Sequence, residues 1–405
     1  MIHFVVTVAD LPDNVNYTIY GDDEYAEFSK ILLKKCGHTV FDDVSSMPFN
    51  AVNFIIVSSP QWPVISKELS DNGHEVIILL HPDGNIWSYY CLTKEIIADV
   101  QIEEKTKVSV KTKNFYNQLA KQTSIIKEDD GRFKTFDSHY HPHFEELFKK
   151  HKEEIDFVVH QLSDAESRGL FNFLLTAKFE DYVQYYLPKM FSHIQYMDYI
   201  NLKPGDVVIN GGVETGFEIP YFTAMLGGKG EIHCFDPLGF SLLADYIKPC
   251  VDAFPGTIIN HQVALMDYNG EIELGTEGPQ AEIKIVQLNK ELNKNFSTKN
   301  FPCVTIDSFM ENQKLSRIDL IKLDLEGADA QALNGAMKTI KRYRPQLALS
   351  IYHFPEDLFT IPYFFMNRLQ EYYYFLGHYS FARWETILYA IPREKLFPKK
   401  LVCQL

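Results

Sequence analysis

The chain has 405 residues, enough for two or three domains of ordinary size. It carries 39 Lys and Arg against 54 Asp and Glu, a formal charge of −15, so it has no basic excess with which to neutralise nucleic-acid phosphates, and we expect no nucleic-acid partner. Its apolar runs fall well short of the roughly 18 residues of a membrane span, and the N-terminus shows no basic leader. We therefore expect no membrane span, no secretory signal and a cytoplasmic protein.

The cysteines are scattered and form no C-x-x-C pair. This pattern is typical of free, mostly buried thiols in a reducing compartment, and it predicts neither a disulfide scaffold nor a cysteine zinc site. The six positions are Cys36, Cys91, Cys234, Cys250, Cys303 and Cys403.

The first hundred residues alternate short apolar runs with amphipathic stretches, the pattern of βαβ units. It predicts strands at 17–21, 53–59 and 74–80 and helices at 23–37 and 62–73, so residues 1–105 form a small Rossmann-like α/β domain. The first turn reads "GDDEYA", with one glycine and three acids, where a dinucleotide fold has G-x-G-x-x-G. Because those acids repel a pyrophosphate, we favour a role in architecture or homo-oligomer contact over nucleotide binding.

Residues 106–195 are more polar and read as a linker followed by a helical lead-in. His139, His141 and His143 have the spacing of three metal ligands, but Pro142 interrupts a strand there, so we favour solvated or hydrogen-bonded histidines and no metal. Further on, Ser163 with Glu166 has the spacing of a capping box and predicts the start of a helix.

Residues 196–405 open with a second βαβ unit. The buried strand "VVIN" leads into the turn Asn210-x-Gly212-x-x-x-Gly216, and the next strand ends at Asp236. Ligands of open α/β sheets bind at such strand ends. Gly212 lets backbone approach a ligand closely, and Asp236 can accept hydrogen bonds from two ribose hydroxyls. The turn does not favour pyrophosphate, so a nucleoside with a charged tail and no phosphates, S-adenosylmethionine, fits better.

A second acidic group follows another fully apolar strand. "RIDLIKLDLEGAD" places Asp324 and Glu326 just after that strand, and a helix at 328–343 and a strand at 346–352 come next. Acids in this position are hard to explain by packing, although Glu326 or Asp329 can also cap the helix that follows. His353 comes directly after the next strand.

These motifs, in order and at these spacings, resemble the FkbM family of S-adenosylmethionine-dependent methyltransferases over about residues 160–395. The motifs include "CFDPLG", "VALMDYNGEIEL", "VTIDSF", "RIDLIKLDLEGAD" and "SIYHFPEDLFTIP…HYS…WETILYA". The resemblance implies a class I methyltransferase sheet of seven mostly parallel strands, closed by an antiparallel hairpin. We expect short strands around residues 270–275, 281–287 and 301–309 to form a flap over the ligand face. It implies cofactor contacts from Asn210, Gly212, Glu214, Gly216, Asp236, Val263, Asp324 and Glu326. Asn210 departs from the family, which usually has Asp there.

The candidate catalytic residues are Asp324 and His353. A hydroxyl acceptor must lose its proton, and histidine has the better ordinary pKa for accepting it, although His353 can also serve only to position a neighbour. Glu326 could clamp the methionine amino group or orient its loop. For Trp384, His378 and Tyr379 we expect hairpin packing, with contact to a sugar ring as the alternative.

We expect an O-methyltransferase acting on a hydroxyl of a sugar or another small acceptor, so its partner is a small molecule or glycan. The alternative is a ligand-binding or scaffold protein that keeps the fold without turnover, which Asn210 makes conceivable. A nicotinamide oxidoreductase is a third interpretation, opposed by the glycine spacing.

Overall fold

The computed structural model describes residues 1–22, 24–48, 52–80, 126–127, 133–134, 147–177, 181, 185, 189, 193–275, 298–380 and 385–396. The three histidines at 139, 141 and 143, together with Cys91, Trp384 and Cys403, lie outside these residues. In the described part, the thiols of Cys234, Cys250 and Cys303 are buried, as the cysteine pattern predicts.

The N-terminal domain is a five-stranded parallel sheet in the order β1-β5-β4-β2-β3. Its three predicted strands and two predicted helices are confirmed, whereas β1 and β3 were not expected because such short strands give no clear pattern. Its elements are β1 (Ile2–Val5), β2 (Asn16–Ile19), α1 (Glu24–Lys35), β3 (Thr39–Phe41), β4 (Asn53–Val57), α2 (Trp62–Asp71) and β5 (Val76–Leu79).

The C-terminal sheet has the seven strands that the resemblance implied, in the order β10-β9-β8-β14-β15-β17-β16. The first five pair in parallel, and β17 runs antiparallel to both β15 and β16, which forms the closing hairpin. The strands are β8 (Val207–Gly211), β9 (Glu231–Phe235), β10 (Ile258–His261), β14 (Leu320–Leu323), β15 (Gln346–Ser350), β16 (Tyr372–His378) and β17 (Thr386–Pro392).

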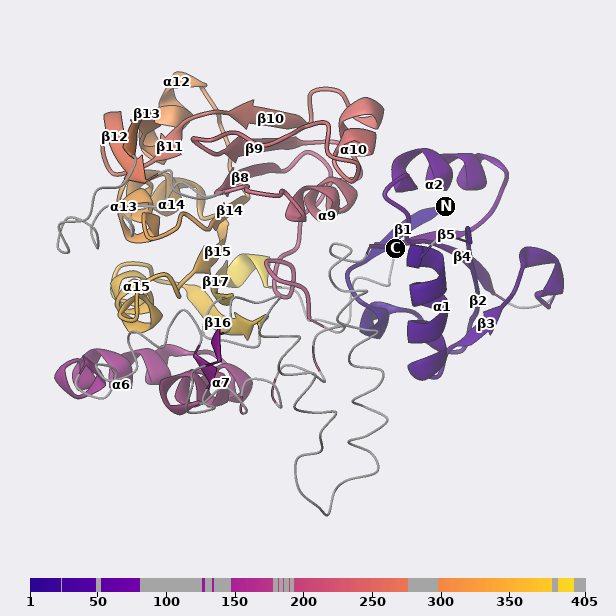
Figure 1. The fold of residues 1–405 in the computed structure, drawn as a ribbon, viewed down its shortest axis with the longest axis horizontal. Coiled ribbons are helices and arrows are strands. Elements are labelled where there is room, and N and C mark those ends of the chain that lie inside the picture. The colour runs from indigo at the N-terminus through magenta and orange to yellow at the C-terminus, as the bar shows by residue number, and fades with distance from the viewer. Residues whose placement is uncertain are drawn as a thin grey trace, which may run out of the picture.

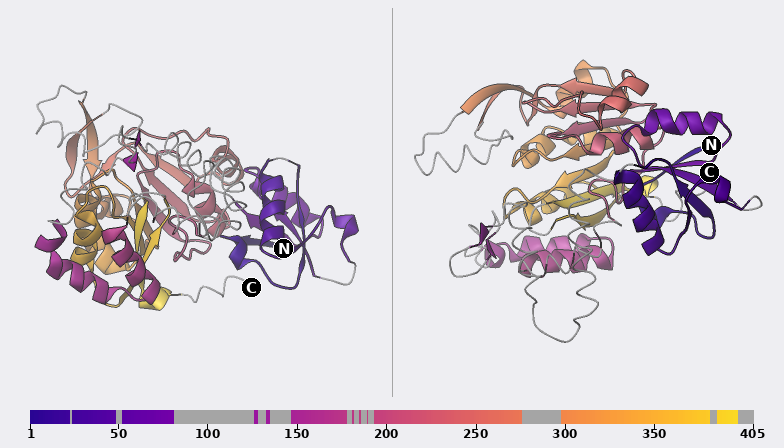
Figure 2. Two further views of the ribbon diagram at one scale, coloured as in Figure 1. Left: turned by 60° about the horizontal axis from the view of Figure 1, so that its bottom comes forward. Right: turned by 45° about the vertical axis from the view of Figure 1, so that its right-hand side comes forward.

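Helices cover both faces of this sheet (Figures 1 and 2). A hydrophobic core lies on each face. One core joins the sheet to α6 (Lys152–Gln161), α7 (Ala165–Thr176), α12 (Ile306–Asn312), α13 (Asp329–Asn334), α14 (Met337–Tyr343) and α15 (Asp357–Met366). The other core joins it to α9 (Glu218–Met225), α10 (Lys248–Ala253) and the N-terminal domain.

The helix expected at 328–343 is broken into α13 and α14. A Cβ on Gly335 would lie 2.2 Å from the Met266 carbonyl oxygen, so only glycine allows this segment to pack against the strand end at 266. The periodicity alone did not reveal this close approach.

The outer edge of β16 is covered by the start of α7. The Tyr374 and Leu376 amides donate to the Ser163 and Ser167 hydroxyls, at 2.8 and 2.9 Å, and this satisfies an edge that would otherwise stay open. The predicted capping role of Ser163 is therefore wrong. Asp164 caps α7 instead and accepts from the Ser167 amide at 2.6 Å.

A small sheet of β11 (Ala264–Leu265), β12 (Gly270–Gly275) and β13 (Thr298–Val304) forms the predicted flap, in the order β11-β13-β12. The third apolar run assigned to the flap, residues 281–287, lies outside the described residues. Within the described part of the chain, no helix is both long and apolar enough to cross a bilayer.

The N-terminal domain docks on the C-terminal domain through an apolar and aromatic contact. Trp62 at the start of α2 packs on Phe254 with 5.9 Å between ring centroids, and Phe4 packs edge-on against Tyr221. The Tyr221 hydroxyl donates to the Leu80 carbonyl at 3.1 Å. The small domain thus helps to bury one face of the larger sheet.

Replacing Trp62 tests this docking. Trp62 is 3% exposed, so Trp62→Ala should lower the free energy of unfolding by about 3–5 kcal/mol, the usual cost of removing a buried large aromatic side chain. Val64→Ala is the matched control on the same helix, since Val64 is 58% exposed. Urea denaturation measures both, and equal stabilities of the two variants would contradict the docking contact.

Candidate active site

A cavity of about 210 Å³ lies at the carboxyl edge of the parallel strands, between the ends of β8, β9 and β14 and the flap. One side is apolar and is lined by Leu238, Leu265, Ile272 and Leu274 among others. The remaining wall is polar. Ligands of open α/β sheets bind at this edge, where the strand order reverses between β8 and β14.

The glycine turn after β8 forms the floor of this cavity. Gly212 has φ +72°, and a Cβ there would lie 1.6 Å from the Asp324 carbonyl oxygen. This glycine is therefore required first for the close approach of the β8 and β14 ends, and not only for approach to a ligand as the sequence suggested. Gly216, with φ +73°, packs against Ile247 and Ile219 and does not line the cavity.

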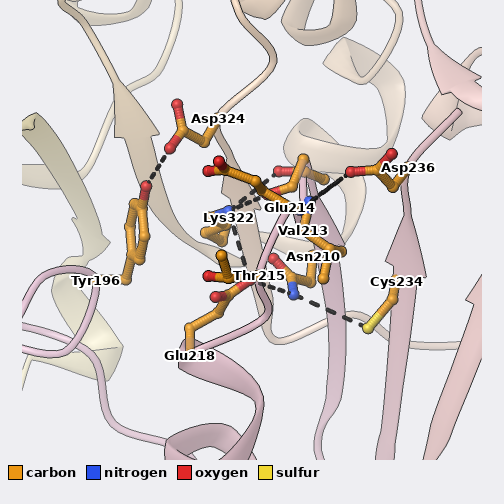
Figure 3. A network of polar contacts seen from close by, with 12 residues as sticks. Tyr196, Asn210, Val213, Glu214, Thr215, Glu218, Cys234, Asp236, Lys322 and Asp324 are labelled. Carbon is orange, nitrogen blue, oxygen red and sulfur yellow. Dashed lines mark hydrogen bonds and ion pairs between the residues drawn. The ribbon is translucent and has the colours of Figure 1, made fainter. Parts of the chain in front are cut away.

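A buried lysine holds the turn from below (Figure 3). The Lys322 ammonium, 2% exposed, donates to the Gly212 carbonyl at 2.5 Å and to the Gly211 carbonyl at 3.3 Å. It also lies 3.6 Å from the Glu218 carboxylate and 4.6 Å from the centre of the Tyr196 ring. Lys322 belongs to the motif "RIDLIKLDLEGAD", but its hydrogen bonds to the carbonyls of the glycine turn were not predicted.

Asn210 belongs to the same network and lies below the cavity wall. Its Nδ2 donates to Glu218 at 2.8 Å, and both side chains are almost completely buried. Glu218 thus places a negative charge beside Lys322, whereas the buried Asn210 Oδ1 has no hydrogen-bond partner in the described part of the chain.

Asp236 faces both the turn and the cavity. Its Oδ2 accepts from the Val213 and Glu214 amides at 3.3 and 3.1 Å, and its Oδ1 accepts from the Leu238 amide at 2.9 Å. A carboxylate offers about four acceptor positions, so these bonds leave room for about one more. Asp236 can still accept from a ligand hydroxyl, but fewer such bonds are open than the sequence suggested.

Asp324 lines the cavity and already has three donor groups around it. Tyr196 and Tyr352 donate their hydroxyls to it at 2.5 and 3.0 Å, and the His353 Nε2 lies 3.1 Å from its Oδ1. Burial alone would raise the pKa of Asp324. The hydrogen bond and charge of His353, together with Lys322, outweigh burial and hold this pKa well below its usual range. Asp324 is therefore a fixed negative charge.

His353 lies behind Asp324 and does not line the cavity. Its Nδ1 is 2.8 Å from the Asp329 Oδ2, so the ring is held between two carboxylates. Burial opposes its charged form, but Asp329 and Asp324 raise the pKa of His353 well above its ordinary value. The expectation that His353 faces the cavity is wrong, and a protonated, enclosed imidazole is poorly suited to accept a substrate proton.

Four lining residues adopt left-handed backbone, which is uncommon for residues other than glycine. They are Tyr196 (φ 66°), Glu214 (φ 47°), Glu326 (φ 50°) and Glu385 (φ 59°). Such strained positions gather at functional sites, because the surrounding structure must hold them.

Glu385 lies just before β17, at the edge of the sheet where the parallel strands end. Its Oε2 accepts from the Gln195 amide group, and Gln195 lines the same wall. Burial, reinforced by the Asp324 carboxylate, raises the pKa of Glu385 from 4.5 to about 7. The cavity thus contains two carboxyl groups whose environments move their pKa values in opposite directions.

The predicted cofactor residues divide into two groups. Gly212, Glu214, Asp236, Asp324 and Glu326 line the cavity, whereas Asn210, Gly216 and Val263 support its wall. Sequence reasoning missed Gln195, Tyr196, Glu218, Tyr352 and Glu385, which also line it. Tyr352 and Glu385 stand within recognised motifs, next to His353 and at the start of the last strand. An acid at a strand end was the signal that could have identified Glu385.

The charge of the lining is strongly negative. Six lining residues are acidic, and Lys322 is the basic one among the lining residues that the structure describes. Within that described part, no group of three or more His, Cys, Asp or Glu side chains has the arrangement of a metal site. A cavity of this kind favours a cationic ligand over an anionic one.

The sheet order, the glycine turn and the acids at the strand ends together define a class I methyltransferase fold. Residues 210–392 match the family model described as the methyltransferase FkbM domain. The chain therefore carries a methyltransferase domain of the FkbM family.

Similar solved structures include methyltransferase FkbM from Methylobacillus flagellatus KT, at 15% identity and a TM-score of 0.47, covering 93% of this chain and 90% of that one. A proposed methyltransferase from Thermoplasma acidophilum has 13% identity and a TM-score of 0.23, with 48% and 71% covered. These likenesses are too weak to bear on function. No curated protein sequence shows significant similarity to this chain.

Moving the buried negative charge from residue 218 to residue 210 tests the network that Asn210 and Glu218 share with Lys322. Asn210→Asp would place a second buried carboxylate beside Glu218 and should lower the free energy of unfolding at pH 7 by about 1–3 kcal/mol. Adding Glu218→Gln should restore most of this loss, because one carboxylate would again face Lys322. Denaturation of the two single variants and the double variant measures the coupling. Additive effects would contradict the shared network.

Proposed function

We propose that this domain is an S-adenosylmethionine-dependent methyltransferase that methylates a hydroxyl group of a sugar or another small acceptor. The observation that carries the proposal is the acid-lined cavity at the strand edge of an FkbM domain. Its apolar side suits a flat base, and its acidic side suits a sulfonium and an ammonium group.

The residues present fit such a ligand. Asp236 would accept from a ribose hydroxyl, and the backbone of Gly212 to Glu214 would border the nucleoside. Leu238, Ile272 and Leu274 would enclose the base. Glu326, which lines the same cavity, would face the amino group. A pyrophosphate fits poorly because the wall is rich in carboxylates, which opposes the nicotinamide interpretation.

When bound, the cofactor supplies an electrophilic methyl group on a positively charged sulfur. The protein's part is to orient the acceptor and exclude water, which together can lower the barrier by about 7–11 kcal/mol. Asp324 would place a fixed negative charge beside the cationic ligand, and His353, held by Asp329, would position Asp324. Tyr196 and Tyr352 would keep that carboxylate pointed into the cavity.

A ligand-binding protein without turnover is the alternative. The intact clamp under the turn weakens it, because Lys322 still binds the Gly211 and Gly212 carbonyls and faces Glu218 with an Asn at position 210. We propose an architectural role for the N-terminal domain, which docks on the sheet face away from α15. A homo-oligomer formed through that domain and a cytoplasmic location stay predictions.

Transfer of a labelled methyl group tests the enzymatic proposal. The full chain, methyl-labelled S-adenosylmethionine and a panel of neutral monosaccharides, glycosides and small polyols should give a labelled, base-stable methyl ether with at least one acceptor. Tight cofactor binding with no labelled product from any class of hydroxyl, amine or thiol acceptor would favour the non-catalytic alternative.

Asp236 should contribute directly to cofactor affinity. Asp236→Ala removes a charged acceptor and also releases the turn amides. The binding free energy for S-adenosylmethionine should therefore weaken by about 1.5–3 kcal/mol, which raises the dissociation constant roughly 10- to 150-fold. Calorimetry measures the change. Asp252→Ala, on the exposed side of α10, is the control carboxylate and should bind normally. Equal affinities in both variants would remove Asp236 from the site.

A further inference from the structure

We infer that Glu385 is the group that accepts the proton of the methyl acceptor, in place of Asp324 or His353. This inference rests on the proposed function and names a residue that the motif analysis did not assign. It depends on where Glu385 lies, on what surrounds it, and on the state of the two competing groups.

Glu385 lies at the edge of the sheet that borders the cavity. β17 runs antiparallel to β15, with Ile387 opposite Ser350, so β17 begins at the edge where the parallel strands end. Glu385 immediately precedes β17 and lines the cavity. The glycine turn and Asp236 lie across the sheet, after β8 and β9. Glu385 therefore lies on the side left for the acceptor once a nucleoside occupies the β8–β9 side.

The backbone and the neighbours of Glu385 fix its orientation. Its backbone is left-handed, its main-chain carbonyl accepts from the Tyr379 amide at 3.0 Å, and its side chain accepts from Gln195. Gln195 in turn donates to the Tyr196 hydroxyl at 3.0 Å, and Tyr196 donates to Asp324. A continuous polar chain thus fixes the two carboxyl groups relative to each other.

The competing groups are occupied. Asp324 already accepts from two tyrosine hydroxyls and faces the His353 ring, and His353 is enclosed between two carboxylates. His353 does not line the cavity, and the pKa of Asp324 is held well below its usual range, so Asp324 is a weak base. Glu385, by contrast, has a pKa near neutrality, which suits proton transfer at physiological pH. The charged or titratable groups around it are Asp324, Glu214, His353, Tyr196 and Tyr352.

In the proposed methyl transfer, the acceptor oxygen forms a bond to the methyl carbon while Glu385 takes the hydroxyl proton. The carbon–sulfur bond breaks, and its electron pair stays on sulfur, which becomes a neutral thioether. A positive charge bound in the cavity would lower the pKa of Glu385 and favour its carboxylate form. Cofactor binding and the readiness of the base are therefore coupled.

Proton release on binding tests this coupling without an acceptor. Calorimetry at pH 7, in buffers of different ionisation enthalpy, should show net proton release on binding of S-adenosylmethionine, because a bound positive charge would displace the proton that the raised pKa of Glu385 retains. S-adenosylhomocysteine, which lacks the sulfonium charge, should release fewer protons. In Glu385→Gln, the difference between the two ligands should become smaller than in the native chain.

Glu371→Gln is the matched control. Glu371 is also a left-handed glutamate of the same hairpin, but it is 62% exposed and pairs with Arg393 away from the cavity. This variant should keep the difference in proton release. Glu385→Asp, which retains a carboxyl group, should keep part of it and guards against a folding defect in Glu385→Gln.

With an acceptor from the methylation panel, Glu385→Gln should lower turnover by about 10²–10⁴-fold while the dissociation constant for S-adenosylmethionine changes little. An unchanged proton difference in Glu385→Gln would overturn the inference and leave the proposed function intact. If the native chain binds neither ligand, the proposed function fails, and this inference fails with it.

Discussion

The candidate site depends on the contacts of the buried Lys322 ammonium. Lys322 lies on the central strand β14, and its ammonium contacts the carbonyls of the glycine turn, the Glu218 carboxylate and the Tyr196 ring. An unpaired charge at this depth would be strongly destabilising, so its partners are fixed in place. The turn that borders the cavity, the network under Asn210 and the wall that carries Tyr196 all follow from this single buried cation.

Around that centre the chain separates the roles of its carboxyl groups by environment. Asp324 is surrounded by donors and an imidazolium and stays charged, whereas Glu385 is buried beside a like charge and holds a proton near neutrality. Two acids whose pKa values are moved apart are typical of sites that divide charge stabilisation from proton transfer. The backbone is left-handed at Glu214, Glu326 and Glu385, so the surrounding structure holds these three side chains in place at the cost of local strain.

Much of the fold could be predicted because strand–helix alternation and the acids at strand ends are local in sequence. Asp236, Asp324 and Glu326 were found in this way. The failures have a different origin. Gly335 breaks a helix because of a contact with Met266, Ser163 serves a distant edge strand, and His353 is enclosed by Asp329 and Asp324. Gln195 and Glu385 lie 190 residues apart and meet only in three dimensions. Such pairings leave no periodic signal in one sequence.

We propose above all that this cavity binds a cationic nucleoside without phosphates. Calorimetric titration of the full chain with S-adenosylmethionine and, separately, with NAD tests this claim most directly. We expect saturable binding of S-adenosylmethionine at one site per chain and no saturable heat with NAD, because the cavity wall carries six acidic residues. Saturable binding of NAD without binding of S-adenosylmethionine would contradict it.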